Sequence, residues 1–234
     1  MQRALALTGL AATLALTSLP AAADLAFNAS LTSDYRYRGI SQTRLKPALQ
    51  GGVDYSAGAF YLGAWGSTIK WIKDAGGDAS AEFDLYGGYK TEIASGLTLD
   101  VGVLQYLYPS NRLNPSANTF EGYGALSFGP ATFKVSRSFS NLFGFADSKG
   151  SMYYDLSASF DLGDGWSLAP HIGRQTVKNL GSASYTDYAL TLNKAIGALT
   201  LSAGLVDAST NAYFGPGGKD LGASRVVVSA KYTF

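Results

Sequence analysis

The sequence has no cysteine and only one histidine, His171. Without cysteine, no disulfide can cross-link the chain, and no thiolate can bind a metal or attack a substrate. Charged residues make up only 15% of the chain, against roughly 25% in an average soluble domain. The formal net charge of +1 argues against a nucleic-acid partner, because nucleic-acid-binding proteins usually carry a strong basic excess. We expect no cofactor and no metal.

Long apolar runs are also missing from most of the chain. After residue 23 there is no stretch of about 20 apolar residues that would form a membrane-spanning helix. Before it, Arg3 is followed by an apolar run over 4–16, then by Pro20 and the small residues 21–23. This order predicts a secretory signal peptide, residues 1–23, with cleavage after Ala23. An N-terminal membrane anchor is the alternative, which the short run disfavours. We expect residues 24–234 to form a single domain.

What is abundant is a two-residue alternation of apolar and polar side chains, in a chain with 28 Gly and 15 Tyr. This period places the two kinds of side chain on opposite faces of a β-strand. The pattern predicts about twelve strands of about ten residues, the length that a tilted strand needs to cross a bilayer. The predicted strands lie near 25–35, 47–57, 60–70, 82–90, 97–103, 119–129, 131–140, 152–162, 166–177, 185–195, 199–207 and 225–234.

The connections between these strands alternate in length. The short ones are 57–59, 94–96, 129–131, 163–165 and 196–198, and the long ones are 38–46, 71–80, 109–118, 140–150, 178–184 and 207–223. Bacterial outer-membrane barrels combine short periplasmic turns with longer extracellular loops. The sequence therefore predicts an all-β, antiparallel, up-and-down transmembrane barrel in the cell outer membrane. A soluble β-sandwich is the alternative, but it does not require this alternation.

Aromatic residues gather near both ends of the predicted strands. Two such girdles flank the apolar band of a membrane barrel. The sequence finishes on an alternating strand with Phe234 as its last residue. This resembles the C-terminal strand that outer-membrane barrels present to their assembly machinery, so we expect that machinery to be a partner.

Several segments resemble the TorF-type porins, a bacterial family formerly of unknown function. The resemblance covers most of the chain after residue 23 and is densest before Pro109. It is carried by Ser30–Thr43 (SLTSDYRYRGISQT), Pro47–Tyr55, Gly63–Ser67, Glu82–Tyr89 and Gly102–Pro109. It implies a porin-like barrel in the outer membrane, and it implies no particular solute or functional residue.

On this interpretation the polar phase of each strand faces the lumen. The candidate lumen-lining residues are Asp34, Arg36, Asp54, Glu82, Asp84, Lys90, Asp100, Glu121, Lys134, Asp155, Asp161, His171, Arg225 and Lys231. Acids outnumber bases in this phase, so an open pore is predicted to prefer cations weakly. Bases such as Arg38 and Arg44 fall in the long loops, where they suit lipopolysaccharide phosphates as well as ordinary solvation.

Catalytic and metal sites are weakly indicated. His171 has Ser167 near it in sequence but no evident third group, so we expect no enzyme. Asp74 and Asp78 lack the full ligand set of a calcium loop. Gly215–Gly218 does not lie between a strand and a helix, as a phosphate-binding loop would.

The function that the sequence favours is passive diffusion of small hydrophilic solutes or ions. The alternative is a closed barrel that acts through its loops, binding a partner, a surface or lipid. A twelve-stranded wall lies between filled and open barrels in size. Small inward residues such as Gly88 and Gly102 favour a bore, whereas Tyr86, Tyr123 and Tyr153 favour a plug. The sequence leaves this choice open.

Overall fold

The computed structural model describes residues 23–234. The predicted signal peptide therefore lies outside the described residues, apart from Ala23. The wall strands are β1 (Asp24–Thr32), β4 (Ala48–Ala57), β5 (Phe60–Thr68), β6 (Ala81–Ala94), β7 (Leu97–Leu107), β8 (Thr119–Phe128), β9 (Ala131–Ser138), β10 (Met152–Ala158), β11 (Phe160–Gly163), β12 (Trp166–Thr176), β13 (Tyr185–Ile196), β14 (Leu199–Ala208) and β17 (Arg225–Thr233).

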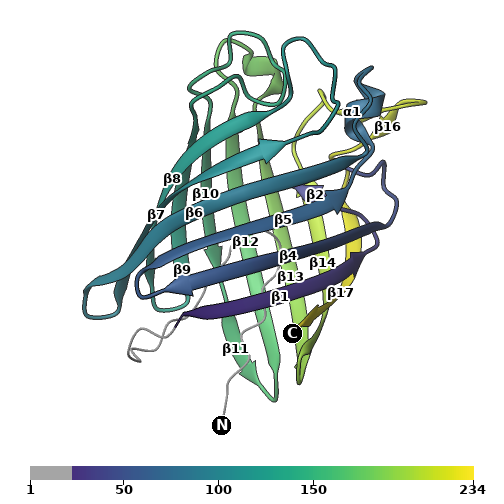
Figure 1. The fold of residues 1–234 in the computed structure, drawn as a ribbon. Coiled ribbons are helices and arrows are strands. Elements are labelled where there is room, and N and C mark those ends of the chain that lie inside the picture. The colour runs from purple at the N-terminus through teal and green to yellow at the C-terminus, as the bar shows by residue number, and fades with distance from the viewer. Residues whose placement is uncertain (1–22) are drawn as a thin grey trace.

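These strands form one closed antiparallel wall (Figure 1). Each strand pairs with its neighbour in the chain, and β1 closes the circle by pairing with β17, with Asn28 opposite Thr233. β10 and β11 both pair with β12 and are two parts of one strand interrupted at Ser159. The wall thus counts twelve strands, and closure leaves no edge with unpaired backbone groups. The predicted barrel is confirmed and the sandwich alternative was wrong.

The two faces of the wall are the reverse of those of a soluble protein. On β6, Phe83 and Leu85 are each 50% exposed on the outer face, while Glu82 and Asp84 are 1% and 0% exposed on the inner face. The same alternation runs along β13 and β17. Within residues 23–234, no helix has the length and apolar character needed to span a bilayer.

The two ends of the barrel differ as the loop lengths predict. The tight turns contain left-handed glycines, such as Gly58 and Gly197 with φ of 60° and 61°. The long loops gather at the other end (Figure 1). Apart from the first loop, they contain four short elements, which are α1 (Trp71–Asp74), η1 (Gly181–Ala183), β15 (Phe214–Gly215) and β16 (Lys219–Asp220).

The largest buried apolar cluster joins the long-loop end of the wall to the loops themselves. Ile69 and Ile72 are fully buried there, and Tyr106 and Tyr108 pack against them from β7 and its end. The rings of Trp71 and Tyr108 meet edge to face at 5.1 Å. The loops are therefore packed into a cap rather than left free in solvent.

The first loop departs from the prediction. The alternating pattern extends the first strand to Tyr35 and places Arg36 on it, but β1 ends at Thr32. The chain then turns inward and forms a small hairpin from β2 (Arg36–Tyr37) and β3 (Ile40–Ser41). We call residues 36–41 the inner hairpin. Its turn is set by Arg38 and Gly39, which both have positive φ. Arg38, which the sequence assigns to an outer loop, lies inside the barrel.

Candidate functional site

The inner hairpin is anchored at its base by Asp34. The Asp34 carboxylate accepts hydrogen bonds from Arg36 Nε at 2.6 Å, Ser41 Oγ at 2.5 Å and Thr43 Oγ1 at 3.2 Å. These donors come from both strands of the hairpin and from the chain that follows. Because all three converge on one carboxylate, Asp34 holds the hairpin in its folded shape.

A second set of contacts fastens the hairpin to the loop between β14 and β17. Arg36 Nη1 donates to the carbonyl oxygens of Gly39 and Leu221 at 2.8 and 2.9 Å. The Ser41 amide also donates to the Leu221 carbonyl, at 2.9 Å. Guanidinium groups are strong donors, so the first and last long loops are joined over the lumen.

The tip of the hairpin reaches wall strands that are not neighbours. Arg38 makes a bidentate pair with Glu121 of β8, with Nη2 2.6 Å from Oε2 and Nη1 3.1 Å from Oε1. Its Nη1 also donates to Gln175 Oε1 of β12 at 2.7 Å. Since β9 and β10 separate these two strands, Arg38 links two wall strands that do not pair with each other.

The inner hairpin also packs closely against the wall. A Cβ on Gly39 would lie only 2.6 Å from the Cβ of Asp187 on β13 and 3.0 Å from that of Ala208 on β14. On the opposite side, Tyr37 and Tyr106 of β7 share a hydroxyl–hydroxyl hydrogen bond of 2.6 Å. The hairpin therefore touches both halves of the wall and fills the outer part of the lumen.

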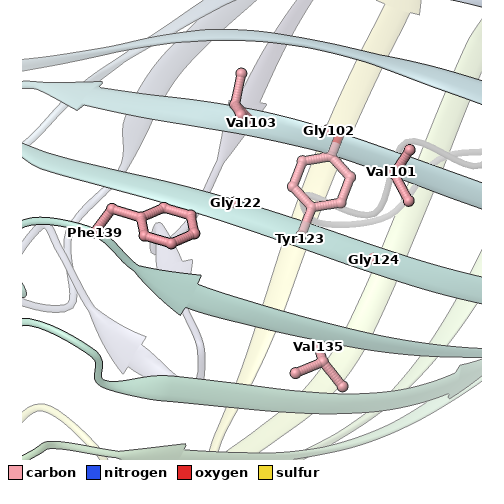
Figure 2. Close-up of a pocket in the computed structure, with 8 residues that line it drawn as sticks. All are labelled: Val101, Gly102, Val103, Gly122, Tyr123, Gly124, Val135 and Phe139. Carbon is pink, nitrogen blue, oxygen red and sulfur yellow. The ribbon is translucent and has the colours of Figure 1, made fainter.

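Below the hairpin, the inward tyrosines lie along the wall. A Cβ on Gly102 would be 2.5 Å from the hydroxyl of Tyr123 on the next strand, and Figure 2 shows the Tyr123 ring extending to that glycine. Glycine on a neighbouring strand makes room for a tyrosine in the same way at three other places, Gly63 with Tyr86, Gly88 with Tyr61 and Gly173 with Tyr153. These rings lie along the wall, whereas the hairpin contacts several wall strands at once.

The phenol groups are hydrogen-bonded to lumen carboxylates. Tyr86 donates to Asp54, and Tyr61 donates to Asp100 at 2.6 Å while also contacting the Tyr123 hydroxyl. The Lys134 ammonium lies 3.8 Å from the centre of the Tyr123 ring. The inner wall is thus polar and aromatic at once.

His171 lies between two carboxylates on this wall. Its Nε2 is 2.6 Å from Asp155 Oδ2, and its Nδ1 is 3.6 Å from Asp187 Oδ1. Tyr153 also donates to Asp187 at 3.1 Å. In the described structure no serine hydroxyl is hydrogen-bonded to the ring, and Ser167 accepts from Asn193 instead. This arrangement matches a structural network better than a nucleophile and its base.

The remaining candidate lumen-lining residues differ in how exposed they are. Lys90 and Lys231 are partly buried on the inner face. Asp161 and Arg225 are exposed near opposite rims, and Asp161 accepts the amide of Gly163 at the turn. Three residues that are not among the candidates predicted from the sequence take part in the contacts of the inner hairpin, namely Arg38, Gln175 and Asp187.

In the outer loops two acidic side chains are paired with arginine. Arg44 forms an ion pair with Asp74, and Arg112 Nη1 is 3.6 Å from Asp78 Oδ2. The hydrogen bond to Asp74 raises the pKa of the Arg44 guanidinium above its ordinary value. Both carboxylates of the possible calcium loop thus have arginine partners.

Two solved porin structures have a similar fold. One titled "KdgM porin" has a TM-score of 0.58 at 7% identity, covering 91% of this chain and 99% of that one. A NanC porin structure has a TM-score of 0.56 at 11% identity, covering 90% and 99%. At such identities the likeness shows the fold alone. No curated protein sequence matches the chain significantly.

Family membership comes from the sequence itself. The family model described as "Bacterial protein of unknown function (Gcw_chp)" matches residues 19–234. The TorF-type name stays a prediction, because the matching description does not carry it. With the whole of the closed barrel inside the matched range, the chain belongs to the Gcw_chp family.

Proposed function

We propose that the protein is an outer-membrane channel for passive diffusion of small hydrophilic solutes or ions, closed in this structure by the inner hairpin. The observation that carries the proposal is the bridge from Arg38 to Glu121 and Gln175 across a polar lumen. A wall that is apolar outside and polar inside suits a membrane channel. A hairpin held across its bore by one arginine suits a closure that can open.

The location follows the same reasoning. An apolar outer face on a closed sheet is stable in a bilayer, and the predicted signal peptide supplies export. The porin-like fold supports the outer membrane. Phe234 is exposed on the short-turn side and packs against Tyr232 at 5.0 Å between ring centres, which suits the proposed recognition by the assembly machinery. Lipopolysaccharide remains a proposed contact of the exposed loop bases.

The solute class is proposed from chemistry and from one neighbour. A KdgM porin structure with 8% identity and a TM-score of 0.57 is titled as a complex with disordered oligogalacturonate. That title concerns the other protein, and it supports passage of small hydrophilic solutes through a barrel of this architecture. The tyrosine and carboxylate groups of the wall offer hydrogen bonds to such solutes.

The charges of the lumen bear on the weak cation preference that the sequence predicts. Much of the lumen acid is already neutralised, since Glu121 pairs with Arg38, Asp34 with Arg36, and Asp155 contacts His171. Reversal potentials across a planar bilayer under a salt gradient test the preference. A reversal potential showing anion preference would contradict it.

Single-channel conductance of refolded residues 24–234 tests the channel itself. We expect brief or small openings in the wild type and a several-fold larger open time or conductance in Arg38→Ala, which loses the bridge. The matched control is Arg44→Ala, an arginine of the same loop whose partner Asp74 lies outside the lumen; its conductance should equal that of the wild type. No conductance in either wild type or Arg38→Ala, with both folded, would reject the channel.

The second candidate is a closed barrel that acts through its loops. It is favoured by the packed cap over the lumen, in which Ile72 and Trp71 join loops to the wall. A folded wild type and a folded Arg38→Ala variant that both fail to conduct would favour this function over diffusion.

A further inference from the structure

Two carboxylates on β6 are buried without compensation. Glu82 and Asp84 are successive inward residues, 1% and 0% exposed. Both oxygens of Asp84 and the Oε2 of Glu82 have no hydrogen-bond partner. Glu82 Oε1 accepts from the Tyr35 hydroxyl at 3.0 Å, and the buried Tyr108 hydroxyl also lies beside the Glu82 carboxylate. Buried polar atoms are nearly always partnered, so three free oxygens at one place need an explanation.

The surroundings supply no positive charge. Across the strand pairs, Asp84 stands opposite Trp65 of β5 and Tyr106 of β7. The Tyr35 and Trp65 rings meet edge to face at 5.4 Å above the pair. Among residues 23–234, no lysine, arginine or histidine forms an ion pair with either carboxylate. Glu121, another acid of the inner face, is already held by Arg38.

Two adjacent ionised carboxylates in a buried, aromatic environment would be strongly destabilising without a counter-charge. We propose that Glu82 and Asp84 bind one divalent cation of the Mg²⁺ or Ca²⁺ class, enclosed by Tyr35 on the segment that leads into the inner hairpin. The two negative charges match one divalent ion. The free donors are all oxygens, which hard cations prefer over softer metals.

The number of protein ligands narrows the choice between Mg²⁺ and Ca²⁺. The described residues hold no group of three or more acidic, histidine or cysteine side chains arranged for a metal. Mg²⁺ is commonly held by one or two carboxylates with water completing its octahedral shell, whereas Ca²⁺ takes about six to eight oxygens. We therefore expect Mg²⁺ to bind at least as well as Ca²⁺, with lumen water supplying the other ligands.

Thermal unfolding of the refolded barrel in micelles tests the site, with MgCl₂, CaCl₂ or EDTA. At about a hundredfold excess over Kd, binding should raise the Tm of the wild type by about 5 °C relative to EDTA. Asp84→Asn should lose this shift and, in EDTA, should be at least as stable as the wild type because a buried charge is gone. The control is Asp100→Asn, a lumen aspartate that already has Tyr61 as its partner; it should keep the full shift.

Isothermal titration with MgCl₂ should give one ion per barrel for the wild type and for Asp100→Asn. If Asp84→Asn does not fold, Glu82→Gln takes its place in both measurements. If the wild type shows no Tm shift and no heat of binding, the metal site is wrong. A proton shared by the two carboxylates would then be the explanation for their burial. An undiminished shift in Asp84→Asn would also overturn the metal site. The inference does not rest on conduction: failure here leaves the Arg38→Ala conductance result unaffected.

Discussion

At the scale of single residues, the lumen wall depends on where glycine stands opposite tyrosine. Gly173 is the tightest case, because an added Cβ would overlap the Tyr153 hydroxyl and lie 2.7 Å from Asp187 Oδ2. Tyr153 is in turn hydrogen-bonded to Asp187 and close to His171. The glycine is therefore required by a close approach, and its backbone φ is not positive.

Gly173→Ala should consequently destabilise the barrel by about 1–3 kcal/mol, through overpacking and loss of the Tyr153 hydrogen bonds. Urea unfolding of the refolded protein in lipid vesicles measures this. Gly124→Ala is the control, since its Cβ would meet only Val101 at 3.9 Å, and it should change stability by much less. Equal losses in the two variants would contradict the tyrosine–glycine account.

The Arg38–Glu121 pair is also decided at this scale. Its side chains are 7% and 3% exposed, so removing one partner leaves a buried charge. We expect Glu121→Ala to lose about 3–5 kcal/mol and the double variant Arg38→Met with Glu121→Leu to lose distinctly less. A double-mutant cycle from urea unfolding gives the coupling. Additive losses would show that the pair is not a unit.

At the scale of elements, the inner hairpin is unusual because it makes few ladder hydrogen bonds with the wall. Its contacts are side-chain bridges and the single backbone bond from Ser41 to Leu221. Such an element can detach without unzipping the barrel, which β1 and β17 keep closed. This separation of hairpin and wall is what allows a closure to move.

A cysteine placed on the hairpin reports that movement, because the chain has none of its own. Ser41 is 1% exposed, so Ser41→Cys should react slowly with a water-soluble maleimide. Adding Arg38→Ala should accelerate labelling at least about tenfold, which corresponds to about 1.4 kcal/mol of opening free energy. Ser224→Cys, at an exposed loop position, should label fast in both backgrounds. Slow labelling in the Arg38→Ala background would indicate a fixed plug.

At the scale of the whole molecule, stability depends on the medium outside the wall. Exposed leucine, valine and phenylalanine side chains cover the outer face of nearly every wall strand. Burying that surface in lipid is favourable, whereas in water it would drive aggregation. The barrel is therefore complete only with the bilayer as its outer solvent.

The depth of this apolar face can be probed on one strand. Leu190 lies midway along β13 and Ile196 at its turn end, and both point outward. Leu190→Arg should cost about 2–4 kcal/mol of folding free energy in vesicles, and Ile196→Arg about 0–1 kcal/mol. Equal costs would mean that the two positions do not differ in membrane depth.

The strands of the barrel wall can be predicted from the local pattern of the sequence. A strict two-residue period fixes which side chains share a face, and glycine-bearing turns fix where strands end, so the twelve strands and the two kinds of connection were predictable from local pattern. The lumen phase of β6, with Glu82 and Asp84, followed from the same alternation.

The position of the inner hairpin in the lumen depends on contacts between distant parts of the chain. In segment 33–43 the local pattern predicts the end of a strand followed by an outer loop, because nothing in the pattern indicates burial. Its position is set by partners far away in sequence, with Glu121 83 residues and Gln175 137 residues from Arg38. Such contacts exist only after the wall has closed, and for that physical reason the closure of the bore could not be derived from the sequence.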